Sequence, residues 1–366
     1  MDTHQQKSNQ VALSSLESFD HATKKDHGWF HVEWFMGRRC NYDCSYCSAL
    51  EHDNISPHVK FEDIQNMVEQ IKNHVQGNKK IKLTLTGGEP FVHPKFLDIL
   101  ELVHEQLSPE QVGITTNGSV PTQKYIDASR YATHFTVSMH LERTEKELQK
   151  IYENALAIKQ QGVWVTITLM LLPGKLDKVK TLTKMFEQDD INYTVREIQP
   201  NFTANGRMIR PYESGYQLTK HIKNDEAFRY DNRQANTQKT LEQYYSREEK
   251  DYLSDKKTTW NNVRVHYEDG SSEETHTDQL ISAERNNFKG WTCYVGTDQI
   301  YVDEVGKVWT ALCRQKGVIG HINSKINFPK PFACALSYCT CNNNIWTRKY
   351  KEPKHKHLIT DHLTEV

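Results

Sequence analysis

The sequence predicts an α/β protein: a partial (β/α)6 TIM-like barrel followed by a small C-terminal hairpin-plus-helix domain. Six strand patterns alternate with five helix patterns along residues 29–200, and the alternation stops near residue 201. Cysteines then gather beyond residue 290. Repeated βαβ units form parallel sheets, and a full barrel needs eight strands. Six strands therefore favour a partial barrel or an open sheet, with ligands at the carboxyl ends of its strands.

Each expected element has its own pattern. Short runs rich in β-branched and aromatic residues predict strands, at 29–36, 80–88, 111–118, 134–140, 163–172 and 192–200. Apolar residues at helical spacing predict helices, at 61–75, 95–107, 122–132, 145–162 and 176–188. The glycine at position 162 is a plausible helix stop.

The pattern divides the chain into five expected segments. They are a polar N-terminal arm at 1–27, the barrel at 28–200, a variable connecting or substrate-covering region at 201–289, a cysteine-bearing domain at 290–350 and a surface tail at 351–366. Two hairpins are expected in the second half. One turns at Asp269-Gly270, and the other, at 290–313, turns near Gly306.

Composition narrows the class of protein. The 366 residues carry a formal net charge of −1, so no global field attracts nucleic acid or an anionic membrane. The longest apolar run, 163–172, is too short to cross a bilayer. The first ten residues lack the pattern of a signal peptide. We therefore expect a cytoplasmic protein whose eight cysteines are not a disulfide scaffold but fall into two groups that suggest two metal sites.

The first group of cysteines is Cys40, Cys44 and Cys47, directly after the first expected strand. Three thiolates on one loop can hold three irons of a cubane cluster and leave the fourth iron open, as in catalytic metal sites. The alternative is a zinc knuckle that borrows His52 or a distant residue.

A second motif follows the second expected strand. Gly87, Gly88, Glu89 and Pro90 fall in its exit loop, where consecutive glycines let backbone approach a ligand and the carboxylate can accept hydrogen bonds from an ammonium group. Alone this could be an ordinary turn. Together with the cysteine triplet it indicates a cofactor site.

The two motifs resemble the signature of radical S-adenosylmethionine (SAM) enzymes, and the resemblance covers roughly residues 29–200. It implies a [4Fe–4S] cluster on the three cysteines, SAM on the open iron and a 5′-deoxyadenosyl radical. It also implies that Tyr46 lies by the adenine and that Gly87–Pro90 bind the methionyl amine.

The resemblance further implies contacts of Asn117 and Ser138 with the ribose and carboxylate of SAM. Capping of strand ends is the alternative reading for both residues. Arg196 stands in an otherwise apolar strand and could pair with a carboxylate inside the barrel or lie on the surface.

The late cysteines form the third group. They bracket the second expected hairpin and continue beyond it, at Cys293, Cys313, Cys334, Cys339 and Cys341. This layout resembles the auxiliary-cluster domain called twitch, which is shorter than the SPASM extension. It implies a second iron–sulfur cluster on four of the five thiols, with Cys293 and Cys313 among them. A structural zinc is the alternative.

These features favour a radical SAM oxidoreductase or maturase. An auxiliary cluster can accept an electron or orient the substrate. Fewer than 30 residues precede the first expected strand, so a peptide-recognition domain is not expected there, which favours oxidation or rearrangement of a sugar-like or nucleotide-linked small molecule. A peptide-modifying maturase and a non-enzymatic zinc or iron–sulfur module remain the alternatives. Flavodoxin or ferredoxin is the expected electron donor.

Overall fold

A computed structural model of the chain describes residues 16–21, 28–42, 44, 53–197, 245–255, 262–339 and 341–359. The cofactor candidates Tyr46 and Cys47, and the zinc alternative His52, lie outside these residues. Of the expected cysteine loop, the structure therefore describes Cys40 and Cys44 near its start and Asp53 at its end.

The centre of the protein is a nine-stranded sheet in the order β13-β12-β11-β2-β3-β4-β5-β6-β7. Its strands β2 to β7 are parallel neighbours. They span Trp29–Phe35, Lys80–Thr86, Gln111–Thr116, His134–His140, Trp164–Leu171 and Asn192–Glu197. The six expected strands and the α/β class are thus confirmed.

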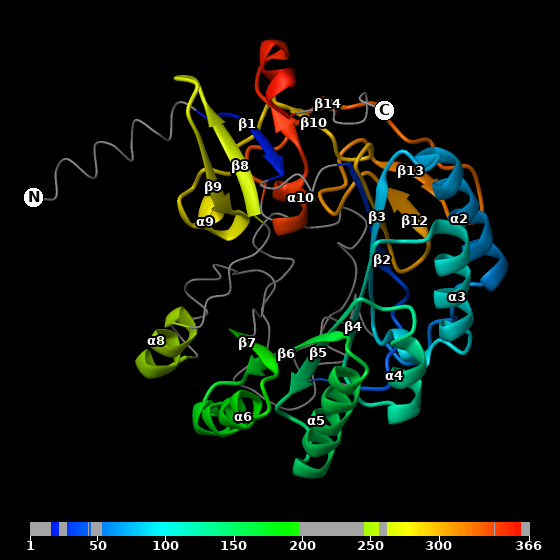
Figure 1. The fold of residues 1–366 in the computed structure, drawn as a ribbon, viewed down its shortest axis with the longest axis vertical. Coiled ribbons are helices and arrows are strands. Elements are labelled where there is room, and N and C mark those ends of the chain that lie inside the picture. Colours follow the sequence, from blue (N-terminus) through cyan, green and yellow to red (C-terminus); the bar gives the residue numbers. More distant parts are fainter. Residues whose placement is uncertain are drawn as a thin grey trace, which may run out of the picture.

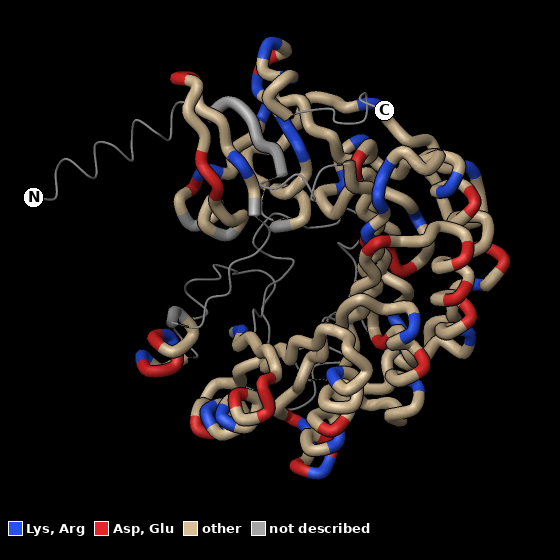
Figure 2. The backbone as a smooth tube through the Cα atoms, in the orientation of Figure 1, with Lys and Arg blue, Asp and Glu red and all other residues tan. Residues whose placement is uncertain are grey.

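Helices alternate with these strands and lie on the outer side of the curved sheet (Figure 1). They are α2 Phe61–Val75, α3 Phe96–Leu107, α4 Thr122–Ala128, α5 Glu145–Gln160 and α6 Leu176–Gln188. A short 3-10 helix, η2 Pro90–Val92, precedes α3. Basic and acidic residues are interspersed along these helices (Figure 2).

Alternation along each strand gives the sheet two different faces. In β5, Phe135, Val137 and Met139 are buried in the core beneath the helices. Ser138 therefore faces the inner side of the sheet, as does Thr168 opposite it on β6. The inner face is the more polar one, which suits a site for polar ligands.

The cysteine-bearing region at 290–350 divides between two sheets. Its hairpin, β11 Gln299–Val302 and β12 Lys307–Trp309, extends the central sheet, and β11 runs parallel to β2. Strand β13 Val318–His321 continues this edge. The turn near Gly306 is confirmed, because that residue has φ of 83° between β11 and β12.

A second sheet has the order β14-β10-β15-β1-β8-β9. Its strands are β14 Phe332–Ala333, β10 Thr292–Cys293, β15 Lys349–Tyr350, β1 Leu16–His21, β8 Asn262–Tyr267 and β9 Ser272–His276. The expected hairpin at 263–277 is confirmed as β8 and β9. Part of the expected connecting region therefore belongs to this sheet.

The N-terminal arm expected at 1–27 contains a strand, so that expectation was wrong for residues 16–21. Strand β1 pairs antiparallel with β8 on one side and with β15 on the other. Its sequence, LESFDH, is too polar to predict a strand alone, and the two neighbouring strands supply its backbone partners.

The remaining described elements are α8 Arg247–Asp255, α9 Thr277–Ser282, α10 Asn342–Trp346 and the 3-10 helix η6 Pro353–Ile359. The expected surface tail is only partly exposed, because His355 and Ile359 of η6 are buried. Among the described residues, no helix combines the length and apolarity that crossing a bilayer requires.

A buried ion pair connects the second half of the chain to the barrel strands. The Arg348 guanidinium donates to both carboxylate oxygens of Asp298, at 2.8 and 3.0 Å. The Lys79 ammonium, just before β3, lies 2.8 Å from the same carboxylate. Burial raises the pKa of Asp298, but the charges of Arg348 and Lys79 outweigh it and lower that pKa.

Candidate functional site

The cysteine loop begins after β2 and is closed at its base by Asp53. The Cys40 N–H donates to the Asp53 carbonyl oxygen at 2.7 Å, and the Asp53 N–H donates to the Arg38 carbonyl oxygen at 2.8 Å. Burial raises the pKa of Asp53, but hydrogen bonds from Ser56 and Ile55 and the Arg38 charge outweigh it and lower the pKa. The backbone of Asp53 therefore holds both ends of the loop together, and its carboxylate fixes the turn that follows through Ile55 and Ser56.

Gly87 and Gly88 let the loop after β3 lie directly on the cysteine loop. The Gly88 N–H donates to the Gly37 carbonyl oxygen at 2.8 Å, and the Glu89 N–H donates to the Arg39 carbonyl oxygen at 2.9 Å. A Cβ on residue 88 would lie 2.3 Å from that Arg39 oxygen. No side chain fits there, so the glycines permit a backbone contact between two loops, besides any approach to a ligand.

Glu89 ties this loop to the end of β4. One carboxylate oxygen accepts hydrogen bonds from the Phe91 N–H at 3.1 Å and the Thr116 hydroxyl at 2.8 Å. The other accepts from the Asn117 N–H at 2.6 Å. Burial raises the pKa of Glu89 to about 7, and these hydrogen bonds oppose the increase. The carboxylate expected to meet an ammonium group thus also fixes the geometry of two loops.

Asn117 connects the end of β4 to the cysteine loop. Its side-chain amide lies 3.6 Å from the Cys40 sulfur and donates to the Asn41 side-chain oxygen at 2.9 Å. The Asn41 amide in turn donates to the Ser119 hydroxyl at 2.8 Å. The side-chain amide of Asn117 therefore contacts the sulfur of the first cysteine, a role that the sequence did not predict.

Tyr42 fixes the loop against the end of β5. The Arg143 guanidinium carbon lies 4.6 Å from the centre of the Tyr42 ring, and the His140 ring meets that ring edge-on at 6.2 Å. Tyr42 is buried, which raises the pKa of its hydroxyl to about 12. Asn41 and Tyr42 were missed because Asn117, Ser119, His140 and Arg143, which they contact, are distant in sequence, and Asp53 was missed because no motif marks the end of the loop.

The thiols that the structure describes fit an iron–sulfur site. Cys44 is buried, and burial raises the pKa of the Cys40 thiol to about 11. Thiols lose their proton on binding metal, and hydrogen-bond donors near the sulfur stabilise the resulting thiolate. The N–H of Tyr42, 3.3 Å from the Cys40 sulfur, and the Asn117 amide are such donors.

Ser138 and Arg196 stand on strands farther along the inner face. Ser138 lies in β5, and Arg196 lies in β7 opposite Met170 of β6. Arg196 shares its face with Thr194, whose hydroxyl donates to Thr168. Both candidates therefore lie on the expected side of the sheet, and their contacts with a cofactor stay predictions.

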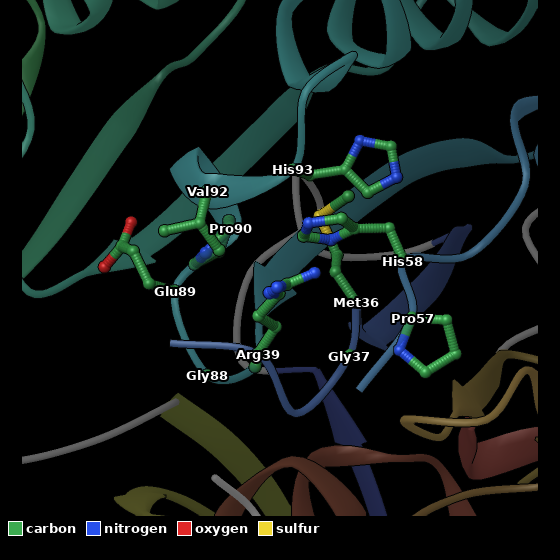
Figure 3. A pocket seen from close by; sticks show the side chains of 11 residues that line it. Met36, Gly37, Arg39, Pro57, His58, Gly88, Glu89, Pro90, Val92 and His93 are labelled. Atoms are coloured by element: carbon green, nitrogen blue, oxygen red, sulfur yellow. The ribbon is translucent and has the colours of Figure 1, made fainter. Parts of the chain in front are cut away.

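A small pocket adjoins the two loops (Figure 3). Gly87 and Gly88 line it together with His58 and His93, whose ring centres are 4.9 Å apart. The Glu89 side chain points away from these histidines (Figure 3). Glu89 also lines this pocket, while its carboxylate accepts hydrogen bonds from Thr116 and Asn117.

Four late cysteines pack in one apolar cluster. Cys293 and Cys334 are buried in it, and Cys313 and Cys339 pack against it. Its other buried members are Trp29, Val263, Val265, Leu280, Phe288, Trp291, Val295, Ala311, Ile345 and Trp346. Four thiols from three separate segments in one dry cluster fit the residues expected to hold an auxiliary iron–sulfur cluster.

Polar side chains hold the late cysteine loops in place. The Gln315 amide donates to the Cys334 sulfur at 3.2 Å, and the Gln315 side-chain oxygen accepts from the Ala335 N–H at 2.6 Å. Asn286 and Cys339 exchange two hydrogen bonds, each 2.8 Å long. Gln315 and Asn286 were not singled out by the sequence analysis.

Cys341 is not a member of this apolar cluster, but it is close enough to Cys313 and Cys339 to interact with them electrostatically. It precedes α10, whose Trp346 reaches the inner face of the central sheet, 6.3 Å from the His31 ring centre and 5.0 Å from the Lys82 ammonium. Burial, followed by the charge of Glu33 on β2, raises the pKa of Cys341 to about 12. The fifth thiol is therefore placed between the cysteine cluster and the barrel.

Burial also raises the pKa of the thiols at Cys293, Cys313 and Cys339. Within the part of the chain that the structure describes, no three His, Cys, Asp or Glu side chains are arranged as metal ligands. The ligand sets of both sites stay predictions, supported by the packing of the thiols and by their hydrogen-bond donors.

The fold and these loops define an α/β protein with a thiol-bearing site at the carboxyl edge of a parallel sheet. Residues 34–185 match the family model described as the radical SAM superfamily. This part of the chain is a radical SAM domain, and that family uses a [4Fe–4S] cluster together with SAM. The resemblance drawn from the two motifs is thereby confirmed.

Curated relatives match parts of the chain. Molybdenum cofactor biosynthesis protein 1 of Drosophila melanogaster is 36% identical over 96 residues, which cover 26% of this chain and 17% of that protein. GTP 3',8-cyclase of Listeria welshimeri is 27% identical over 175 residues, which cover 44% of this chain and 52% of that protein. The matches span about half the length of such relatives or less.

Solved structures resemble the chain over a longer range at lower identity. The structure described as native anSMEcpe with bound AdoMet covers 81% of this chain and 79% of its own, with 16% identity and a TM-score of 0.48. A likeness at this level supports no statement about substrate.

Proposed function

We propose that the protein is a radical SAM enzyme that abstracts a hydrogen atom from a small-molecule substrate. The observation that carries the proposal is the bonded set of Cys40, Glu89 and Asn117, which joins the carboxyl ends of β2, β3 and β4. Bound at this edge, a [4Fe–4S] cluster with SAM supplies a 5′-deoxyadenosyl radical.

The residues at this edge have distinct roles. Cys40, Cys44 and Cys47 hold the cluster, and the Asn117 amide stabilises the Cys40 thiolate. The backbone at Gly87–Pro90 binds the methionyl amine, while Glu89 keeps that loop against the end of β4. These assignments rest on the close backbone contact that Gly88 permits with Arg39.

Three side chains complete the SAM site. Tyr46 contacts the adenine, and Ser138 and Arg196 meet polar groups of SAM or of the substrate from the inner face. The position of Ser138 and Arg196 on that face supports this part of the proposal.

The late cysteines form an auxiliary iron–sulfur site of the twitch or SPASM kind. Cys293, Cys313, Cys334 and Cys339 are its ligands, because these four pack in one apolar cluster of which Cys341 is not a member. The site accepts an electron from the substrate radical or orients the substrate. Flavodoxin or ferredoxin supplies the electron that starts the reaction.

The substrate is a sugar-like or nucleotide-linked metabolite that undergoes oxidation or rearrangement. Relatives named GTP 3',8-cyclase support the nucleotide-linked class, since their name specifies a nucleotide substrate. A ribosomal peptide is the alternative substrate. The protein can be incubated separately with pools of nucleotides, of sugars and of peptides. The pool that increases the formation of 5′-deoxyadenosine would identify the substrate as a small molecule or as a peptide.

Anaerobic reconstitution with iron and sulfide tests the proposal. We expect brown protein with about eight irons, as for two cubane clusters. Reduction in the presence of SAM should release 5′-deoxyadenosine. A colourless protein that holds zinc and leaves SAM intact would instead identify a non-enzymatic metal-binding module.

Two variants test the two proposed cluster sites independently of each other. Cys44→Ala should lose about half of the iron and all SAM cleavage, whereas Cys293→Ala should lose about half of the iron and keep the first cluster. Full iron content in both variants would contradict the assignment of ligands.

A further inference from the structure

Two exposed apolar side chains lie on the segment that carries the late cysteines. Leu336 is 37% exposed and Tyr338 is 56% exposed, and both stand between Cys334 and Cys339 in the chain. The Cys334 thiol donates to the Leu336 carbonyl oxygen at 3.8 Å. The thiols proposed to hold the auxiliary cluster are therefore close to an exposed apolar stretch of the surface.

Three exposed lysines stand on the segments that meet at these thiols. The residue after Lys289 donates its N–H to the Cys334 carbonyl oxygen at 2.8 Å. The Lys316 ammonium lies 5.0 Å from the ring centre of Phe332, and Lys330 precedes that phenylalanine by two residues. Phe332 is in turn the strand partner of a late cysteine, at position 293. The three lysines therefore stand around the apolar stretch.

Acidic side chains are withdrawn from this part of the surface. Among the described residues from 286 to 351, Asp298 and Asp303 are buried and Glu304 is partly buried. The exposed charged residues of the same range are the lysines at positions 289, 316, 325, 330 and 351. The whole chain has a formal net charge of −1, so the positive surface is a local feature that favours an anionic partner.

We propose that the surface formed by Lys289, Lys316, Lys330, Leu336 and Tyr338 docks an acidic electron-carrier protein of the flavodoxin or ferredoxin class. One electron passes from the reduced auxiliary cluster to the oxidised carrier, and no bond forms or breaks. The inference rests on the proposed auxiliary cluster and adds the route by which its electron leaves the protein.

The pattern of side chains favours this kind of partner. Protein interfaces combine an apolar centre, often with tyrosine, and a charged or polar rim. Rim charges of one sign steer an oppositely charged protein into contact. Two copies of the chain that met symmetrically through this surface would bring lysine against lysine. A redox partner fits best, because the surface lies beside the sulfur atoms of the proposed cluster.

The test uses protein that holds the auxiliary cluster alone. In a Cys40→Ala, Cys44→Ala background the first cluster should be absent, and about four irons per chain should remain. This protein is reduced with dithionite, separated from the reductant and mixed with an acidic flavodoxin in its oxidised form. Stopped-flow absorbance of the flavin semiquinone then gives the second-order rate constant of electron transfer.

Two results in this background would overturn the inference before any lysine is changed. A background that binds no iron would remove the auxiliary cluster itself, which is a failure of the proposed function. A background that holds the iron and transfers no electron to flavodoxin would leave the proposed function intact and overturn the docking surface alone.

Reversal of the three lysine charges tests the surface. Lys289→Glu, Lys316→Glu and Lys330→Glu together should slow the transfer at least about tenfold at low ionic strength. The rates should converge at about 1 M salt, where the Debye length is about 3 Å. The matched control reverses three exposed lysines on helices α2, α5 and α6, namely Lys72, Lys146 and Lys184. Equal rates for the two triple variants would overturn the proposal, because their net charges are the same.

Neutral substitutions cover the case in which charge reversal loses the iron. Lys289→Gln, Lys316→Gln and Lys330→Gln together should keep the iron, since all three side chains are exposed, and should give an intermediate rate. An unchanged rate would overturn the proposal.

A basic surface with an exposed tyrosine also resembles a site for single-stranded nucleic acid. Fluorescence anisotropy with a labelled polythymidine oligonucleotide, at about 0.15 M salt, measures such binding. We expect equally weak binding by the glutamate triple variant and by its parent. Binding that only the triple variant loses, with electron transfer unchanged, would assign the surface to nucleic acid and overturn the proposal.

Discussion

The side-chain amide of Asn117 lies 3.6 Å from the sulfur of Cys40, although 77 residues separate them in the sequence. The contact joins the loop after β4 to the loop after β2. It places an N–H donor beside the first of the three early thiols, where it can influence a bound cluster directly.

Asn117→Ala should lower the reduction potential of the first cluster. Loss of an N–H donor to a thiolate destabilises the more negative, reduced state, by about 1 kcal/mol or roughly fivefold in the equilibrium. A redox titration in a Cys293→Ala, Cys313→Ala background measures it. Ser119→Ala is the control, because it removes the bond to Asn41 and keeps the Asn117 amide. Equal potentials for the two variants would show that the contact has no effect.

The raised pKa of Glu89 predicts that the free energy of unfolding depends on pH. Its pKa is about 7 in the folded protein and ordinarily 4.5, so the folded state binds the proton more tightly. The stabilisation from this carboxyl is complete below pH 4.5 and is lost as pH rises through 7, by about 3 kcal/mol in total. Urea unfolding of the metal-free protein and of Glu89→Gln at several pH values should show this difference. A difference that stays constant from pH 4.5 to 8 would contradict the shift.

Asp298→Ala should strongly destabilise the fold. It leaves Arg348 buried without its bidentate partner, and removal of one member of a buried ion pair costs about 3–5 kcal/mol. The exposed pair between Arg264 and Glu274 is the control, since Glu274→Gln should cost less than about 1 kcal/mol. Denaturant unfolding measures both, and similar small losses would show that the buried pair does not stabilise the structure.

Gly88→Ala should separate the glycine loop from the cysteine loop. The added carbon would clash with the Arg39 carbonyl oxygen, and such overpacking costs about 1–3 kcal/mol. We expect weaker SAM binding and faster loss of iron. Gly162→Ala is the control, because its added carbon meets nothing within 4 Å, and the strain of alanine at its positive φ should lower stability without changing SAM affinity. Wild-type SAM affinity in Gly88→Ala would show that the loop contact is dispensable.

Much of the site could be predicted because its residues follow strands in sequence. Because parallel strands have their carboxyl ends at one edge of a sheet, the strand pattern alone predicts that Cys40 and Gly88 lie at the same edge. The strands and helices were predicted from the spacing of apolar residues, because that spacing reflects which side of each segment is buried. The class of the domain followed from the spacing of the cysteines and glycines.

Other features depend on partners that a local pattern does not specify. Asp53 and Asn41 are polar loop residues in the sequence, and only the folded backbone shows what they bind. Strand β1 is stabilised by β8 and β15, each far away in the chain. The hairpin of β11 and β12 was expected, but the parallel pairing of β11 with β2 was not. The sequence of a short apolar strand does not indicate which other strand it pairs with.

The pairing of β11 with β2 has a consequence for synthesis of the chain. Residues 29–35 leave the ribosome long before residues 299–302, so one edge of β2 lacks its partner while most of the protein is being made. Unpaired strand edges are templates for aggregation during folding. A fragment that ends before residue 299 retains this open edge, which is available for pairing with another chain.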